Sequence, residues 1–494
     1  MALYNANQLN GAGTPIEALN GGTAYLFSIT SSACTGSAYF TVETVRNSSG
    51  YYGGQPTNAI GSYYEFVSIN QDTLITSSYI SSVVVPEGIS SYKFIPLLDV
   101  TVSSSFLRGT GGISGGVALS PSGNPVEFII SVQTDNFGGT NDDQFKLSWT
   151  GGSLSVDWGD GEVDGAAIGA RTHTYATPGY YVIKVVGDAG SSIQHGARGL
   201  DNNKIIEIQQ WGAHAWGNMD SAFLNCQSMD IVAVDRPNLS AVTDMSNMFG
   251  SCFLMVGNVS IGQWDVSNVT NMFNMFNNSK LFNQPIGDWD VSNVTDMRQM
   301  FNTATAFNQN INSWDVSNVT DMRSMFSNAT DFNQPIGNWN VSNVTTMEFM
   351  FNEANSFNQD ISSWAVGSVT NMRSMFRENT AFNQPLNSWD VTGVTDMRNM
   401  FFENTAFNQP IGDWDVSNGP TMGAMFQKND VFNQDISSWN VSNVTNMSGM
   451  FFEATSFNQN LSSWSVNNVT VCSNFSTGAT SWTLPQPNFT SCTP

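Results

Sequence analysis

The stretch FNQPIGDWDVSNVTDMRQMF, residues 282–301, decides the fold because most of the chain repeats it. Its tryptophan, Trp289, recurs every 25 residues from Trp264 to Trp464, and its phenylalanine, Phe282, recurs on the same step. A fixed period of this length is typical of a solenoid, in which each repeat is one coil that buries its apolar residues only against neighbouring coils. The repeats, with imperfect copies at both ends, predict a solenoid of roughly eleven coils over residues 196–475.

Two patterns inside one coil predict two kinds of element. In residues 288–292 (DWDVS) apolar and polar residues alternate, which is the period of a strand with one buried side. Residues 295–301 (TDMRQMF) begin with a helix-start residue and place Met297, Met300 and Phe301 on one helical face. The stacked coils are therefore predicted to form an α/β solenoid, with a parallel sheet on one flank and short helices on the other.

The chain before the coils is predicted to contain two β domains. Residues 1–105 hold stretches such as 24–30 and 38–45 that are rich in aromatic and β-branched residues and separated by Gly, Ser and Asn, which indicates an all-β domain. A Gly- and Ser-rich linker follows at 106–125, and residues 126–195 form a second, smaller β unit. The protein is therefore expected to be multidomain, ending in a cap or tail over residues 476–494.

Two motif sets resemble known families. The turn Trp158-Gly159-Asp160-Gly161, followed by Tyr175 before a Pro-Gly turn, resembles the framework of polycystic-kidney-disease (PKD) type immunoglobulin-like domains. The run W-D-V-S-N-V-T-x-M-x-x-M-F, with F-N-Q between coils and an IEIQQWG stretch before them, resembles the BspA-like bacterial surface leucine-rich repeats. That resemblance covers residues 126–475 and implies a leucine-rich-repeat-like solenoid that attaches to host or matrix components. The first 105 residues lie outside it.

Composition excludes several classes of partner. A net charge of −24 with only 16 Lys and Arg argues against nucleic acid and against anionic membranes, both of which need clustered cations. We expect no membrane span, because no apolar run approaches the roughly 18 residues that a span needs. The N-terminal stretch MALYNANQLNGAGTPIEALNGG has neither the basic nor the apolar segment of a secretory signal.

No catalytic or cofactor chemistry is expected. The three histidines, His173, His195 and His214, lie outside known nucleophile and metal motifs, and the strand acids occupy repeated positions although a catalytic pair should be unique. Structural calcium is the one ion that the sequence leaves open, through the acids of the loop 157–164. These acids lack the ligand spacing and the closing Glu of an EF-hand, which favours structural turn residues. The loop acids are Asp157, Asp160 and Asp164.

The cysteines allow two disulfides. Cys226 and Cys252 lie 26 residues apart, close to one repeat, which would stack them on adjacent coils. Cys472 and Cys492 could pair at the C-terminal cap. Buried free thiols are an equally good interpretation of both pairs.

The candidate binding residues form one column on the outward side of the predicted strands. A long surface of short acids and amides can hydrogen-bond sugar hydroxyls, a basic protein or divalent ions. The alternative is a solvated face that keeps the sheet soluble. The column consists of Asp265, Asp288, Asp290, Asp315, Asn338, Asn340, Asp390, Asp413, Asp415 and Asn440.

These observations lead us to expect a non-enzymatic surface adhesion or recognition protein. With no secretory signal in view, the hypothesis is a bacteriophage virion fibre or decoration protein on the virion surface. Residues 1–105 would dock on other virion proteins, and the solenoid would contact a host surface glycan or protein. The alternatives are a purely structural decoration (cement) protein of a capsid or tail, and a bacterial cell-surface adhesin.

Overall fold

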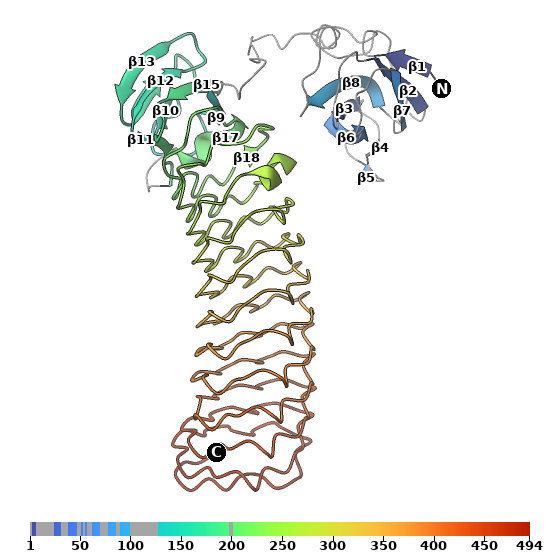
Figure 1. Ribbon diagram of the computed structural model, residues 1–494, viewed down its shortest axis with the longest axis vertical. Helices are drawn as coiled ribbons and strands as arrows, with labels where there is room; N and C mark the ends of the chain where they lie inside the picture. Colours follow the sequence, from blue (N-terminus) through green and yellow to red (C-terminus); the bar gives the residue numbers. More distant parts are fainter. Residues whose placement is uncertain are drawn as a thin grey trace. The chain divides into compact units, whose positions relative to one another are not determined.

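The computed structural model describes residues 127–196 and 201–494 with their side chains and, before them, the backbone of eight strands (Figure 1). Contacts divide the chain into two compact units, Met1–Pro125 and Val126–Pro494, and each is described by itself. Among the described residues, no helix has the length and apolar character that crossing a membrane requires.

The first unit is built from strands, in agreement with the all-β prediction. One sheet has the order β1-β2-β7, with β1 parallel to β2, and a second, antiparallel sheet has the order β6-β3-β8. Strands β4 and β5 pair with each other. The linker predicted at 106–125 lies outside the described residues. The strands are β1 (Ala2–Asn5), β2 (Ala24–Thr30), β3 (Ala38–Arg46), β4 (Tyr51–Tyr52), β5 (Gln55–Pro56), β6 (Ser62–Ile69), β7 (Ser78–Val84) and β8 (Ile89–Leu98).

The second unit begins with a six-stranded mixed sheet of order β13-β12-β15-β9-β17-β18, accompanied by the two-stranded ladders β10–β14 and β11–β16. Its core holds large buried side chains such as Phe128, Trp149 and Trp158. The strands are β9 (Phe128–Gln133), β10 (Gln144–Leu147), β11 (Trp149–Thr150), β12 (Ser153–Asp157), β13 (Val163–Ile168), β14 (Arg171–Thr174), β15 (Tyr180–Gly187), β16 (Ser192–Ile193), β17 (Ile205–Gln210) and β18 (Asp230–Ile231).

The sheet continues directly into the coils. Strand β17 pairs antiparallel with β9 on one side and parallel with β18 on the other, so the last two strands already have the parallel stacking of the repeats. One hydrophobic core extends without interruption from Phe128 to Trp482. The segments predicted as separate domains at 126–195 and 196–475 therefore share one core.

A buried ion pair reinforces this junction. Lys204, in the short 3-10 helix η2 (Asn202–Lys204), donates from Nζ to the carbonyl oxygens of Asn141 at 2.7 Å and Gln144 at 2.9 Å. Asp201 accepts from the backbone amides of Gly139 and Lys146 at 2.8 Å and 2.6 Å. Both charged side chains are fully buried, so their hydrogen bonds hold the β9–β10 loop against the start of β17.

The parallel sheet predicted for the coils is reduced to one bridge per coil, and this part of the prediction is wrong. Turns occupy residues 287–288 and 292–293, and the Trp289 amide donates to Ile286 in its own coil at 3.2 Å. The extended segment between the turns is therefore too short to form a ladder. Parallel bridges instead link Asp296 to Asn271 and to Asp321, with equivalent bridges in most other coils.

The short helix predicted at 295–301 is also wrong. An α-helix needs each amide to bond four residues back. Here the Met300 amide bonds the carbonyl oxygen of Met297 in the same coil at 3.2 Å, whereas the amides of Gln299 and Phe301 cross to the next coil at 2.9 and 3.0 Å. Gln299 also has a positive φ of 58°. The segment is a series of turns, and the only helices in the described coils are short 3-10 helices such as η3 (Val259–Gln263).

Columns of identical side chains fill the coil interior, as the period predicts. The rings of Trp314 and Trp339 stack at 6.5 Å with an interplanar angle of 2°, and Phe301 and Phe326 stack at 5.7 Å. On the flank, Asn308 Oδ1 accepts from the Asn333 amide in the next coil at 3.0 Å, and this amide ladder recurs from coil to coil. Each coil thus buries the apolar side chains of its neighbours and provides hydrogen-bond partners for their backbone groups.

The last coil ends in an aromatic cap. Trp482 packs edge-on against Phe457 at 4.7 Å and against Phe451 at 5.2 Å, which covers the end of the phenylalanine columns. Pro420, which replaces the threonine that neighbouring coils carry at the position of Thr295, disturbs the stack only locally. The bridge between Asp396 and Thr421 is present, but none joins Thr421 to the following coil.

Candidate interaction surface

The ten residues of the predicted binding column are all exposed on one flank of the coils. Most of them have a local structural role. Asp290 Oδ1 accepts hydrogen bonds from the amide of Ser292 at 3.1 Å and from its hydroxyl at 2.6 Å, which is the geometry of an Asx turn. The Ser292 hydroxyl also lowers the pKa of Asp290 below its usual value. The same turn is made at Asp265, Asp315, Asn340, Asp390, Asp415 and Asn440.

The remaining members of the column lie beside these turns. Asp413 Oδ2 accepts from Asn387 Nδ2 at 2.5 Å in the preceding coil. The backbone amide of Asn338 donates to Asn312 Oδ1 at 3.3 Å. Asp288 is exposed, like the other members of the column. The recurrence of acids and amides along this flank therefore has a structural explanation, since most coils make an Asx turn at this point, with Ala365 and Ser465 as the exceptions.

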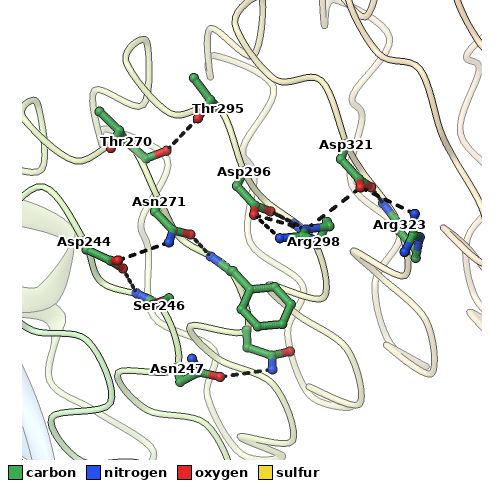
Figure 2. Close-up of polar contacts among 12 residues, drawn as sticks. Asp244, Ser246, Asn247, Thr270, Asn271, Thr295, Asp296, Arg298, Asp321 and Arg323 are labelled. Atoms are coloured by element: carbon green, nitrogen blue, oxygen red, sulfur yellow. Dashed lines mark hydrogen bonds and ion pairs between the residues drawn. The ribbon is translucent and has the colours of Figure 1, made fainter.

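A second, half-buried surface follows the bridge residues, and we call it the turn face. In the coil of Trp289 it consists of Asp296, Arg298, Gln299, Asn302 and Thr303, and in other coils of the residues at the same positions. Figure 2 shows its beginning, with Asp244, Asn271, Asp296 and Asp321 following one another along the stack.

The turn face holds all the long charged side chains of the residues that follow Lys280. After Lys280, every Arg, Lys and Glu lies on it, and so does every Phe that is outside the core columns and the C-terminal cap. Apart from Leu281 and Val431, the exposed remainder of these coils carries Asp, Asn, Gln, Ser, Thr, Gly, Ala and Pro. The residues concerned are Arg298, Arg323, Glu348, Phe349, Glu353, Arg373, Arg377, Glu378, Arg398, Phe402, Glu403, Lys428, Phe452 and Glu453.

One network of ion pairs extends along this face from coil to coil. Arg298 Nε lies 2.9 Å from Asp296 Oδ1 in its own coil and 3.9 Å from Asp321 Oδ2 in the next (Figure 2). Arg323 lies 3.6 Å from Asp321 and 3.3 Å from Glu348. Acid and base therefore alternate along the stack.

A second network lies at the other edge of the turn face. Arg377 Nη1 is 3.4 Å from Glu353 Oε1 and also pairs with Glu378, and Lys428 Nζ is 2.8 Å from Glu403 Oε1. The Arg377 guanidinium also lies over a neighbouring phenylalanine ring, Phe402, at 5.1 Å from its centroid. Arginine and aromatic side chains are thus combined on one surface.

The fold does not require these side chains. The arginine side chains of the first network are 39–44% exposed and their acid partners 16–23%, and ion pairs at the surface contribute about 0–1 kcal/mol each. The position of Arg298 is filled by Gly423 and Ser448 in later coils, and that of Gln299 by Phe349 and Ala424. The backbone bonds of the turns are made whichever residue is present, so these positions are free to serve recognition.

Sequence reasoning missed the turn face although a signal was available. The distribution of Arg, Lys, Glu and non-core Phe along the repeats marks it without coordinates. The predicted helix concealed it, because charged residues are ordinary on the outer side of a surface helix.

The histidines are packed framework residues. His173 Nε2 is 2.8 Å from Asp160 Oδ2, and its ring stacks on Trp158 at 4.9 Å. His195 is fully buried, which lowers its pKa to about 4, and partial burial lowers that of His214 to about 4. In the described part of the chain, no group of three or more His, Cys, Asp or Glu side chains could hold a metal ion.

The loop acids considered for calcium are bound to protein groups. Asp157 Oδ1 accepts the Gly159 amide at 3.0 Å, and Asp164 lies 3.4 Å from Arg171. Of the five cysteines, Cys34 lies outside the described residues, and the other four fall into two kinds. Cys472 and Cys492 form a disulfide at the C-terminal cap. Cys226 and Cys252 are buried free thiols, and burial raises the pKa of both.

One family matches the repeats. A family described as "Mycoplasma protein of unknown function, DUF285" matches residues 217–322, 306–403 and 385–488, which together span more than half of the chain. The chain belongs to the DUF285 family. Each match covers about four coils of 25 residues, so the DUF285 unit is itself a short stack of the coil described above. No curated protein and no solved structure matches the chain.

Proposed function

We propose that this protein is a non-catalytic recognition protein, in which the coils are a rigid support and the turn face contacts another macromolecule. One observation carries the proposal. The long charged side chains and extra phenylalanines of the last 213 residues, from 282 to 494, are confined to a face where folding does not need them. Arginine and aromatic residues are enriched in protein interfaces and among the residues that dominate binding energy.

The length of the turn face favours a macromolecular partner. Its charged positions extend from Arg298 to Glu453, which is six coil steps. At the spacing of about 4.8 Å between paired strands, six steps cover about 29 Å, well beyond the reach of one small ligand. The ion pairs hold the side chains in a defined order, which reduces the entropy lost when a partner binds.

The resemblances to PKD-like domains and to BspA-like surface repeats support a location outside the cell. The WGDG turn and Tyr175 suit a PKD-like sandwich, and the repeat consensus suits a BspA-like surface solenoid, for which attachment to host or matrix is the expected role. A disulfide at Cys472 and Cys492 is consistent with an oxidising environment. The carrier would be a virion surface, with residues 1–105 docked on other virion proteins, or a bacterial cell surface.

The repeats provide substitutions for testing the proposal. Each turn-face residue can be replaced by a residue that another coil carries at the same position, so that folding is preserved. One variant combines Arg323→Ser, Phe349→Ser, Arg373→Ser and Arg377→Asn, as in Ser448, Ser324, Ser473 and Asn302. The matched control changes the column instead, with Asp290→Asn, Asp315→Asn, Asp390→Asn and Asp415→Asn, as in Asn340.

The assay measures binding of the labelled full chain to intact bacterial cells and to their isolated cell walls. We expect at least a ten-fold loss of binding for the turn-face variant and little change for the column control. Equal losses, or a loss only in the column control, would contradict the assignment of the turn face. Immunogold labelling of particles and of uninfected cells tests the location separately. Label on cell envelopes without particles would favour the cell-surface adhesin.

A further inference from the structure

The coils that follow Lys280 present only acidic charge away from the turn face. Beyond Lys280, the exposed remainder of the repeats holds ten aspartates and no Lys or Arg, and the whole chain has a net charge of −24. Like charges on two molecules repel each other, so two copies could not approach through these flanks without cost. The ten residues are Asp288, Asp290, Asp315, Asp331, Asp360, Asp390, Asp413, Asp415, Asp430 and Asp435.

The turn face has the opposite property, because its charges are nearly balanced. It carries six cations after Lys280, and eight acids accompany them. A second copy of the chain could therefore lie against this face without net repulsion. The acids are Asp296, Asp321, Glu348, Glu353, Glu378, Asp396, Glu403 and Glu453.

The long charged side chains, apart from Arg377, are also sorted into two columns of opposite sign, and the aspartates at the position of Asp296 pair with the basic column. The position of Arg298 forms a basic column, and the position of Thr303 forms an acidic column five residues further along each coil. Each column contains one exception, Glu348 in the basic column and Lys428 in the acidic one. The basic column is Arg298, Arg323, Glu348, Arg373 and Arg398, and the acidic column is Glu353, Glu378, Glu403, Lys428 and Glu453.

We propose that the turn face pairs two copies of the chain side by side and parallel. A two-fold axis parallel to the stack exchanges the columns, so the basic column of one copy faces the acidic column of the other at the same coil level. Arg373 then meets Glu378 of the partner subunit, and Arg398 meets Glu403 of the partner subunit. Symmetry doubles these contacts to four ion pairs.

Two further features fit this arrangement. At one level the arrangement brings two acids together, because Glu348 faces Glu353 of the partner subunit. In each copy, Arg377 already pairs with Glu353, so a cation lies beside these two acids. At the centre of the face, Arg373 Nε is buried without a hydrogen-bond acceptor, so its guanidinium can reorient without losing a bond at that atom. An antiparallel arrangement would instead set Arg323 against Arg373 of the partner subunit.

This inference rests on the proposed function, because it takes the turn face as an interface and names a second copy as one partner. The test is a charge exchange in the full chain, followed by sedimentation velocity at low salt over a range of protein concentrations. One variant carries Arg373→Glu and Arg398→Glu, and the other carries Glu378→Arg and Glu403→Arg. We expect the unmodified chain to dimerise and each variant alone to dimerise at least ten-fold more weakly.

An equimolar mixture of the two variants is the decisive sample, because it restores opposite charges at the exchanged positions. We expect the mixture to form dimers again, and added salt to weaken them. The control variant Asp413→Asn with Asp415→Asn should dimerise like the unmodified chain. Circular dichroism verifies that every variant is folded.

Three results would overturn the proposal. The first is an unmodified chain that stays monomeric at every concentration. The second is a charge-exchange variant that dimerises as strongly as the unmodified chain, and the third is a mixture of the two variants that stays monomeric. Binding of the same variants to cells and cell walls is measured in parallel. Monomers that still bind through the turn face would refute the dimer alone and leave the proposed function standing.

Discussion

The indole nitrogen Nε1 of Trp289 donates a 2.8 Å hydrogen bond to the carbonyl oxygen of Ile261 in the preceding coil. The same bond recurs at each following tryptophan of the column up to Trp464, with Leu386 replacing isoleucine once. Each tryptophan therefore contributes both buried apolar area and a polar tie to the neighbouring coil. Trp264 is the exception, because its indole nitrogen is buried without an acceptor.

This exception provides a matched pair of substitutions. Trp339→Phe keeps an aromatic ring but removes the indole donor to Ile311, whose carbonyl oxygen then accepts only from the Trp314 amide. We expect Trp339→Phe to lower the free energy of unfolding by about 0.5–1.5 kcal/mol more than Trp264→Phe does. Urea unfolding followed by circular dichroism measures the difference. Equal losses would show that ring packing alone matters.

The amide ladder should be similarly sensitive. Asn333 Oδ1 accepts the Asn358 amide at 3.0 Å and Gln359 Nε2 at 2.8 Å. Asn333→Ala leaves both donors without this acceptor, and we expect a loss of about 1–3 kcal/mol. Asn310→Ala is the control, because this exposed position is Pro285 one coil earlier. If the control costs as much as Asn333→Ala in the same unfolding experiment, the ladder does not stabilise the stack.

Acid should destabilise the junction between the six-stranded sheet and the coils through His195. Burial lowers its pKa to about 4 in the folded chain, against about 6.5 in an unfolded chain. Between these values the unfolded chain binds a proton that the folded chain does not. The free energy of unfolding therefore falls as pH decreases from about 6.5 to about 4, with a limiting slope of about 1.4 kcal/mol per pH unit. We expect His195→Gln to reduce that slope in urea titrations, and an unchanged slope would refute the assignment.

Removal of one whole coil should be tolerated. Deleting residues 307–331 joins Ala306 to Phe332 and leaves every remaining coil with an equivalent neighbour. We expect a folded, cooperative protein whose solenoid is shorter by about 4.8 Å in small-angle scattering. Deleting residues 307–326 instead shifts the repeat out of register and should prevent folding of the following coils. Binding of the 25-residue deletion to cells distinguishes two roles of the solenoid. Unchanged binding would favour a mere spacer, and weaker binding would favour a contact surface.

The cysteines should differ in reactivity. Cys226 and Cys252 are buried and burial raises their thiol pKa, so iodoacetamide should not modify them in the folded chain. Reduction should open the disulfide of Cys472 and Cys492, allow modification of both and make residues 476–494 easier to cleave with protease. Mass spectrometry of modified peptides measures each site. Modification of Cys226 before reduction would show that the first coils open.

Much of the solenoid was readable from its period, whereas the local conformation was not. The spacing of Trp289 and Phe282 predicted stacked columns, and both columns are formed. The i, i+3, i+4 spacing of Met297, Met300 and Phe301 also predicted a helix, which is wrong. Those side chains do face the core, but successive turns place them there as well as a helix would.

The function of the exposed residues, like the local conformation, was only partly predictable from the sequence. The acids of the column are exposed as predicted, but the hydrogen bond from Ser292 to Asp290 gives them a structural purpose that sequence reasoning did not assign. The turn face was visible in the distribution of Arg and Glu, yet its meaning depended on knowing that Gly423 or Ser448 serves the fold equally well.

The sequence by itself determined the coil length, the members of the core columns and the extent of the repeats. A side chain that recurs every 25 residues must meet the same environment in each coil, and only a stack of equal coils provides that. Tertiary structure decided the conformation between Asp296 and Thr303. There each backbone amide can donate to a carbonyl oxygen in its own coil or in the next coil. Alternate amides donate to the next coil, because its carbonyl groups lie within hydrogen-bonding distance. Local sequence does not contain the neighbouring coil, so it could not predict this choice or the exposed face that results.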